Sequence, residues 1–315
     1  MGQNDWTTTG LMMGILALSC AFSPATRAGG GEALWISNAQ GSWFETGNWV
    51  DGQAPRAGLD ARFGVSGFED PLDEVDIDNA GNGVQQDSDA LIVIEKVRFF
   101  DSSAGGDPSL ADDGLAFDVM RFDGQGGDAV IVDVPITARS LQSRRHGAIF
   151  NREITAAEIL AESSHQDQWQ INGGATAPIA LVRLDEDRGP DGDTIDGQLA
   201  VNTDLEVALV EQVWGRLVVG TEAILMVRNY IHHDYSGEPE FSNINPIRID
   251  GTLQADDFRV FSVTSQSTTL LPPGTHGRIG HASAEFEQEF ITGDGLLVVL
   301  GRSLFSDRFE PAPSP

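Results

Sequence analysis

The chain has 315 residues and a formal net charge of −29 at pH 7, from 48 acidic and 19 basic residues. Lys96 is the only lysine. A surface of this sign repels the phosphates of nucleic acids and of anionic lipids, and it gains no counterion-release energy from them, so we expect neither as a partner.

Residues 1–28 are predicted to form a signal peptide. Residues 10–22 are an uninterrupted apolar run, too short to span a bilayer, and Thr26-Arg27-Ala28 ends in small residues where a signal peptidase cleaves. The segment before the run is atypical, because it carries Asp5 and no basic residue. Cleavage after Ala28 removes Cys20, the only cysteine, so the mature chain would have neither disulfides nor a membrane span. Lipidation of Cys20 is the alternative.

Residues 34–63 contain three tryptophans close together, Trp35, Trp43 and Trp49. Buried indoles of this kind can close the end of a β-core that would otherwise contact water, so we expect an N-terminal cap here. The alternative is a carbohydrate-binding platform, in which exposed Trp43 and Trp49 stack on sugar rings.

Short apolar runs rich in β-branched residues recur along residues 29–302, and glycine, aspartate or asparagine bounds each of them. This pattern predicts an all-β domain. One segment, residues 155–163, leaves helix and strand open, because Ala156, Ile159 and Leu160 also fit one helical face. The clearest strand candidates are residues 90–94, 129–134, 205–210, 217–219 and 296–300.

A carboxylate-rich segment between glycines is the candidate metal site. Calcium takes six to eight oxygen ligands, which a flexible acidic loop can supply, although the spacing here is not that of an EF-hand. The sequence therefore predicts weak calcium binding, with a solvated turn as the alternative and no other cofactor. The candidate ligands are Asp185, Asp187, Asp191, Asp193 and Asp196.

A glycine precedes an apolar triplet at four places, beginning at Gly197, Gly215, Gly251 and Gly295. The first two intervals are multiples of 18 residues and the third is close to two intervals of 22, which are lengths typical of one coil of a β-solenoid. We therefore expect a right-handed parallel β-helix or solenoid. Its inward residues would include Leu199, Leu217, Leu253 and Leu297. A β-sandwich with long loops is the alternative.

Residues 228–235 hold both tyrosines of the chain and two of its six histidines. Tyr230 or His232 could act as a base, and Arg228 could neutralise a substrate carboxylate, which is chemistry suited to a polysaccharide lyase. A polar loop between strands is the alternative. Residues 303–315 are predicted to be a flexible tail, with a sorting feature in its Phe-x-Asp-x-Phe-Glu pattern.

Two parts of the sequence resemble bacterial secreted and surface β-solenoid proteins, including autotransporter passenger domains and exported proteins with Pro-Glu-Pro sorting signals. The resemblance implies an extracellular or cell-surface location and a β-solenoid architecture, and it names no reaction. His276 replaces the tyrosine that is usual at its position. The matching motifs are Trp35, Gly41-Ser42-Trp43, Asn48-Trp49, Gly52-Gln53-Ala54-Pro55 and Asp60, and near the C-terminus residues 270–276 and 290–298.

Three functions from different classes are consistent with these features. The first is a non-catalytic extracellular or cell-surface protein with a structural, adhesive or matrix role. The second is a polysaccharide-active enzyme, either a lyase or a glycosidase. The third is a carbohydrate-binding module. Extracellular polysaccharides, cell-surface components and other copies of the chain are the expected partners. We favour the first function, because the sequence contains no Gly-x-Ser-x-Gly, His-Glu-x-x-His or nucleotide-binding motif.

Overall fold

The computed structural model describes residues 32–35, 41–52, 54, 60–63, 75–78, 84–85, 90–92, 97–100, 114–122, 129–144, 147–162, 168–185, 198–235 and 246–301. These residues all belong to one compact unit. Their regular elements are β-strands, apart from two short 3-10 helices, Thr46–Asn48 and Val50–Gly52. The predicted all-β class is confirmed. The predicted signal peptide, residues 1–28, and the predicted tail, residues 303–315, lie outside the described residues.

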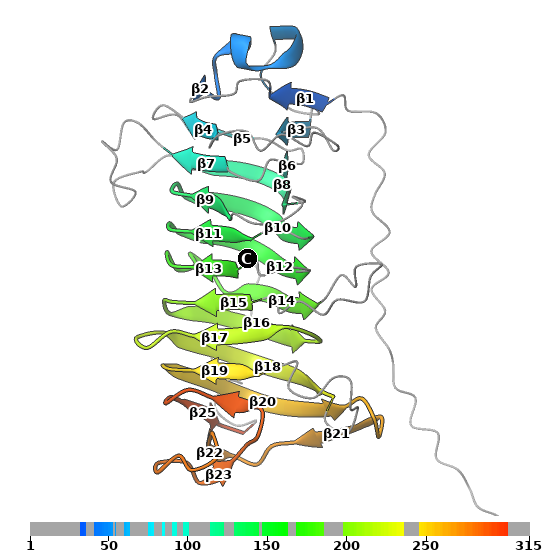
Figure 1. The fold of residues 1–315 in the computed structure, drawn as a ribbon, viewed down its shortest axis with the longest axis vertical. Coiled ribbons are helices and arrows are strands. Elements are labelled where there is room, and N and C mark those ends of the chain that lie inside the picture. Colours follow the sequence, from blue (N-terminus) through cyan, green and yellow to red (C-terminus); the bar gives the residue numbers. More distant parts are fainter. Residues whose placement is uncertain are drawn as a thin grey trace, which may run out of the picture. The chain divides into compact units, whose positions relative to one another are not determined.

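The strands form two sheets (Figure 1). In pairing order, the first sheet consists of β1 (Glu32–Trp35), β3 (Asp60–Phe63), β6 (Ala90–Ile92), β8 (Leu115–Phe122), β10 (Ile136–Arg144), β12 (Ile154–Glu162), β14 (Ile179–Asp185), β16 (Leu205–Gln212), β18 (Ile224–Asp234), β20 (Thr252–Ser262), β25 (Leu296–Val299), β22 (Gly274–Gly277) and β23 (Phe286–Glu287). Two further strands pair beside this path, β5 (Val84–Gln85) with β8 and β21 (Ser267–Leu270) with β20. The second sheet consists of β2 (Gly41–Ser42), β4 (Val75–Asp78), β7 (Val97–Phe100), β9 (Val130–Val132), β11 (Ala148–Phe150), β13 (Gln168–Ile171), β15 (Gln198–Val201), β17 (Arg216–Val219), β19 (Ile247–Ile249) and β24 (Ile291–Thr292).

From β8 to β20 the chain alternates between the two sheets, one strand in each. Neighbouring strands of one sheet are parallel, so the strand in the other sheet is part of the connection that returns the chain to the same end. Among the described strands, antiparallel pairing occurs only between β20 and β21 and between β22 and β25. This pairing differs from the antiparallel sheets of a β-sandwich.

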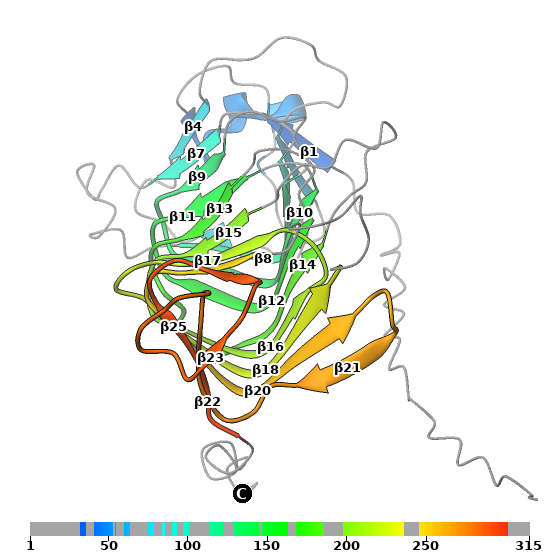
Figure 2. The same ribbon diagram turned by 60° about the horizontal axis from the view of Figure 1, so that its bottom comes forward.

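Each long strand of the first sheet bends once, and Figure 2 shows these strands curving. The pairing of β18 with β20 omits Arg228 and Asp256, and the pairing of β10 with β12 omits Arg139 and Ala157. Because two successive residues face away from the core at the bend, the alternation changes phase there. The core-facing residues of such a strand are therefore separated by two, three and two positions. Examples are Leu205, Val207, Val210 and Gln212 in β16, and Leu225, Val227, Tyr230 and His232 in β18.

The bend also explains the segment for which the sequence left helix and strand open. Residues 155–162 do not form a helix, because β12 occupies Ile154–Glu162 and pairs in parallel with both β10 and β14, while residue 163 lies outside the described residues. Ala156 and Ile159 are both buried, on either side of the bend. A spacing of three between core residues therefore imitates the period of a helix, although the backbone is extended.

The four predicted inward leucines are all buried, with at most 1% of each side chain exposed. The spacing between them, however, does not reflect the regular coil length that the sequence predicts. Leu199 and Leu217 are neighbours in the second sheet, whereas Leu253 and Leu297 are neighbours in the first. The 36-residue interval, from Leu217 to Leu253, therefore joins strands of two different sheets. The 44-residue interval, from Leu253 to Leu297, separates two strands that pair directly, so it is one step along the first sheet rather than two. Insertions between strands, and not a fixed coil length, set the longer intervals.

The repeated glycines also differ in their structural roles. Gly215 has a φ of 86°, a left-handed conformation that favours glycine at the turn before β17. Gly251 and Gly295 lie instead at stacked turns, where an added Cβ on Gly251 would collide with the carbonyl oxygen of Gly220 and one on Gly295 with that of Gly251. Gly197 lies outside the described residues. The same glycine-led pattern therefore serves two different purposes: a left-handed φ at Gly215, and close backbone packing at Gly251 and Gly295.

A ladder of side-chain amides follows the short turns from the second sheet to the first. The Nδ2 groups of Asn151, Asn172 and Asn202 donate to Asp133 Oδ1, Asn151 Oδ1 and Asn172 Oδ1, at 2.7, 2.8 and 2.8 Å. Arg98 Nε donates to Asp133 Oδ2 at 2.7 Å. Asp133 and the three asparagines each directly follow a strand of the second sheet, so the ladder holds successive turns in register.

Both ends of the first sheet carry antiparallel contacts. Trp35 of β1 forms an antiparallel bridge with Trp49, and β22 pairs antiparallel with β25 at the other end. An exposed edge strand is a template for pairing with other chains, and covering it reduces that hazard. The tryptophan-rich segment therefore occupies one end of the sheet, as predicted for a cap.

Candidate functional site

Two of the three predicted catalytic residues meet in the interior. Tyr230 and His232 occupy the last two core-facing positions of β18, and they are 0% and 1% exposed. Arg228 lies apart from them, at the bend of the strand. There its charge opposes the burial that raises the pKa of Asp256 on β20, and Asp257 raises this pKa further. The arrangement in which Arg228 assists Tyr230 or His232 on one substrate is therefore not formed.

Gln212 of β16 joins the two buried side chains. The Tyr230 hydroxyl donates to Gln212 Oε1 at 2.7 Å, and His232 Nδ1 lies 3.1 Å from the same oxygen. Since a carbonyl oxygen only accepts, the Nδ1 atom carries the proton in this arrangement. Gln212 Nε2 donates to the carbonyl oxygen of Gly215 at 2.7 Å. The amide therefore has partners at both of its ends.

Aromatic rings enclose this cluster. Tyr230 stacks on Phe258 with ring centroids 4.6 Å apart, and His232 stacks on Phe290 at 4.5 Å. Burial lowers the pKa of His232 to about 4, against the charge of Asp234, which raises it, while His233 lowers it further. Burial also raises the pKa of the Tyr230 hydroxyl. Both groups are therefore neutral at pH 7, and neither faces solvent where a polymer could reach it.

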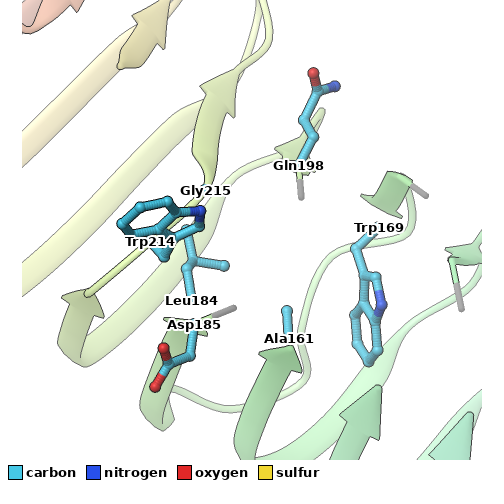
Figure 3. A pocket seen from close by; sticks show the side chains of 7 residues that line it. All are labelled: Ala161, Trp169, Leu184, Asp185, Gln198, Trp214 and Gly215. Atoms are coloured by element: carbon cyan, nitrogen blue, oxygen red, sulfur yellow. The ribbon is translucent and has the colours of Figure 1, made fainter. Parts of the chain in front are cut away.

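A small cavity lies beside the cluster and shares Gly215 with it. It has a volume of about 10 Å³, which is the least that a single water needs. The residues that line it, drawn in Figure 3, belong to β12, β13, β14, β15 and the turn between β16 and β17. A sugar ring does not fit a space of this size. The lining residues are Ala161, Trp169, Leu184, Asp185, Gln198, Trp214 and Gly215.

A row of charged side chains crosses the outer face of β14, β16 and β18. Arg183 Nη2 lies 2.7 Å from Asp185 Oδ2, and Arg183 Nε lies 3.9 Å from Glu211 Oε2. His233 Nε2 lies 3.8 Å from Glu211 Oε1. Burial lowers the pKa of His233, Glu211 and Asp185 raise it, and Arg183 lowers it. This row is partly exposed, so it can contact a ligand from solvent, although such ion pairs add little stability.

The predicted calcium ligands fall mostly outside the described residues. Asp187, Asp191, Asp193 and Asp196 belong to residues 186–197, the connection from β14 to β15. Asp185 ends β14, and its carboxylate pairs with Arg183. Within the described ranges, no group of three or more histidine, cysteine or acidic side chains could hold a metal ion. Calcium binding by the whole loop stays a prediction.

The two predicted sugar-stacking tryptophans are buried. Trp43 and Trp49 are 2% and 1% exposed, and their ring centroids lie 5.0 Å apart in an edge-to-face arrangement around Phe63. Trp49 Nε1 donates to the carbonyl oxygen of Trp43 at 2.8 Å. Stacking on a sugar requires an accessible ring face, and these rings offer none. The structure therefore corrects the platform reading and favours the cap.

Sequence reasoning missed Gln212, Glu211 and Arg183. The available signal was the alignment of β14, β16 and β18 by their core-facing positions, which places Leu184, Gln212 and His232 in one register. A glutamine in a position otherwise held by apolar residues indicates a buried polar partner. The apolar residue before Asp133, Asn151, Asn172 and Asn202 was the corresponding signal for the ladder.

No family model, no curated protein and no solved structure matches this chain. In the part of the chain that the structure describes, neither helix has the length or the apolar character needed to cross a bilayer.

Proposed function

We propose that the chain is an exported right-handed parallel β-solenoid that acts as a non-catalytic scaffold, with a structural or adhesive role at the bacterial surface or in the extracellular matrix. The alternation of strands between two parallel sheets from β8 to β20 supports the solenoid. A connection between parallel strands of one sheet is almost always right-handed, which supports the handedness.

One observation carries the functional part of the proposal. The side chains best suited to catalysis, Tyr230 and His232, are used in packing and in hydrogen bonds to Gln212. The neighbouring cavity has room for about one water molecule. A general base must reach the proton that it abstracts, either directly or through one water. The buried cluster is better suited to holding β16 and β18 together than to turning over a polymer.

Export is tested on the native protein. Residues 10–22 and Ala28 motivate the expectation that the secreted form begins near Gly29. Mass spectrometry of the protein from the culture medium and from the cell surface would give its N-terminus. Intact Met1 on protein confined to the cytoplasm would overturn the extracellular part of the proposal.

A polysaccharide-active enzyme is the second candidate. The row formed by Arg183, Asp185, Glu211 and His233 favours it, because paired carboxylates on an accessible face can carry acid and base chemistry. The carbohydrate-binding alternative loses its predicted platform, since Trp43 and Trp49 are buried.

The experiment that separates these functions uses purified secreted protein and a panel of acidic and neutral polysaccharides. Absorbance of unsaturated ends reports a lyase, new reducing ends report a hydrolase, and retention on the polymer reports binding. The scaffold proposal predicts no turnover. Turnover that is lost in Glu211→Gln and kept in Glu206→Gln, a change at another glutamate of β16, would establish the enzyme instead.

A further inference from the structure

The strand β21 presents an edge that is open among the described residues. It pairs with β20 alone, and all four of its side chains are exposed. Figure 2 shows β21 beside β20, on the side away from β22 and β23. Unlike β1 and β25, it has no further antiparallel partner among the described residues. Such an edge offers backbone donors and acceptors to another strand.

The outward backbone groups can be assigned from the known hydrogen bonds. Leu271 N donates to the carbonyl oxygen of Phe258 at 2.9 Å. In an antiparallel pair, directly bonded residues alternate with residues whose backbone groups point away. The register joins Val260 to Thr269 and Ser262 to Ser267, so these pairs bond within the chain. The N–H and C=O groups of Thr268 and Leu270 therefore point outward.

Natural proteins guard open edges with charged residues, and this edge has none. Residues 263–277 contain no aspartate, glutamate, lysine or arginine, in a chain with a net charge of −29. A second copy that approaches along this edge meets the least like-charge repulsion at the point of contact. A basic or acidic partner, in contrast, would find no charge here to recognise. Leu270, which is 50% exposed, adds apolar area at the same place.

We propose that two copies of the chain associate through β21, antiparallel and related by a two-fold axis at Thr269. This register places Thr268 opposite the second copy's Leu270, and the reverse, so all four outward-pointing residues of the two strands exchange backbone hydrogen bonds. The two Thr269 side chains lie directly opposite each other, and such threonine pairs stabilise antiparallel strands. The interface is isologous and closes at two copies. It does not depend on the proposed scaffold function or on export.

The short edge predicts a weak dimer whose formation rises with salt, because screening reduces the repulsion between two acidic chains. Sedimentation of the full chain over a dilution series, at low and high ionic strength, measures it. Thr269→Glu opposes two carboxylates at the axis, and Thr268→Pro removes an outward N–H that β20 does not use. Both variants should be monomeric at the concentration where the unchanged protein is dimeric.

Two controls keep the test specific. Thr268→Val retains the backbone donor, and Thr221→Glu adds the same charge at an exposed turn before β18. Both should sediment as the unchanged protein does, and circular dichroism spectra of all variants should coincide. A chain that is monomeric at every concentration and salt level would overturn the proposal. So would a dimer that persists in both Thr269→Glu and Thr268→Pro.

Discussion

Gln212 is the residue through which the buried polar cluster is satisfied. Its Oε1 atom accepts from Tyr230 and His232, and its Nε2 atom donates to Gly215. In the neighbouring strand β14, the same register position holds Leu184. An apolar side chain therefore occupies the equivalent position one strand away, whereas Gln212 adds hydrogen bonds there.

Replacing Gln212 with leucine should leave the Tyr230 hydroxyl and His232 Nδ1 buried without an acceptor. Each unsatisfied buried group costs roughly 1–3 kcal/mol, so we expect the free energy of unfolding to fall by about 2–6 kcal/mol. Urea titration measures the change. Adding Tyr230→Phe to this variant removes one of the stranded donors, so part of the loss should be recovered. Equal stability of Gln212→Leu and the unchanged protein would show that the cluster contributes nothing.

His232 should make the stability depend on pH. Its folded pKa of about 4 lies below the ordinary value of 6.5, so the unfolded chain binds a proton between these values that the folded chain does not. The free energy of unfolding therefore falls as the pH drops from 6.5 to 4, by up to about 3 kcal/mol from this residue. The lowered pKa of His233 acts in the same direction. His232→Leu should flatten this slope, and an unchanged slope in that variant would contradict the assignment.

At the scale of the strands, sequence patterns predicted the all-β class and the inward leucines better than they predicted how the strands are connected. Leu199 and Leu217 stack at the predicted spacing of 18 because the connection between β15 and β17 has no insertion. The 44-residue step from Leu253 to Leu297 contains β21, β22, β23 and β24, whose pairing no local pattern indicates. The bend in the first sheet hid the alternation of β12, because core residues three apart fit a helix equally well.

The core position of Leu217 can be tested against its outward neighbour. Leu217→Asp buries an unpaired charge and should cost about 3–5 kcal/mol or prevent folding. Val218 lies next to it on β17, is only partly buried and pairs in register with Arg248. Val218→Asp should therefore change the urea midpoint little. Similar losses for both variants would contradict the assigned faces of the second sheet.

The amide ladder makes its own prediction. Asn172 donates to Asn151 and accepts from Asn202, so Asn172→Ala removes two hydrogen bonds at one turn. We expect a loss of about 1–3 kcal/mol in the free energy of unfolding. Gln170→Ala, a change on β13 two residues earlier, is the matched control and should have a smaller effect. If the control is as destabilised as Asn172→Ala, the hydrogen bonds of the ladder do not account for the loss.

Sequence reasoning found two residues of the candidate site, but it predicted neither their burial nor their contact with Gln212. Tyr230 and His232 were found because residues 228–235 are rich in polar side chains. Their burial follows from the phase change at Arg228, which places residues 230 and 232 on the inner face. The contact with Gln212 depends on pairing between strands 20 residues apart, which local composition does not predict.

For the whole molecule, charge is the dominant sequence property. A net charge of −29 destabilises a compact chain at low ionic strength, so both sodium and calcium salts should raise the melting temperature through screening. If the loop that includes Asp185 binds calcium, millimolar calcium should raise it further at matched ionic strength, because binding to the native state alone stabilises it. Identical melting curves in the two salts would leave these aspartates as solvated turns.

Strands that are distant in the sequence stack in parallel and in register, and one fluorescence measurement tests this arrangement most directly. Val218 and Arg248 are register partners on β17 and β19, with side chains on the outer face of the second sheet. In a Cys20→Ser background, cysteines at both positions labelled with pyrene should give strong excimer emission, because paired strands lie about 4.8 Å apart. Cysteines at Val218 and Gln254, which lie in different sheets, should give monomer emission only. Excimer emission from the Val218 and Gln254 pair but not from the Val218 and Arg248 pair would contradict the account.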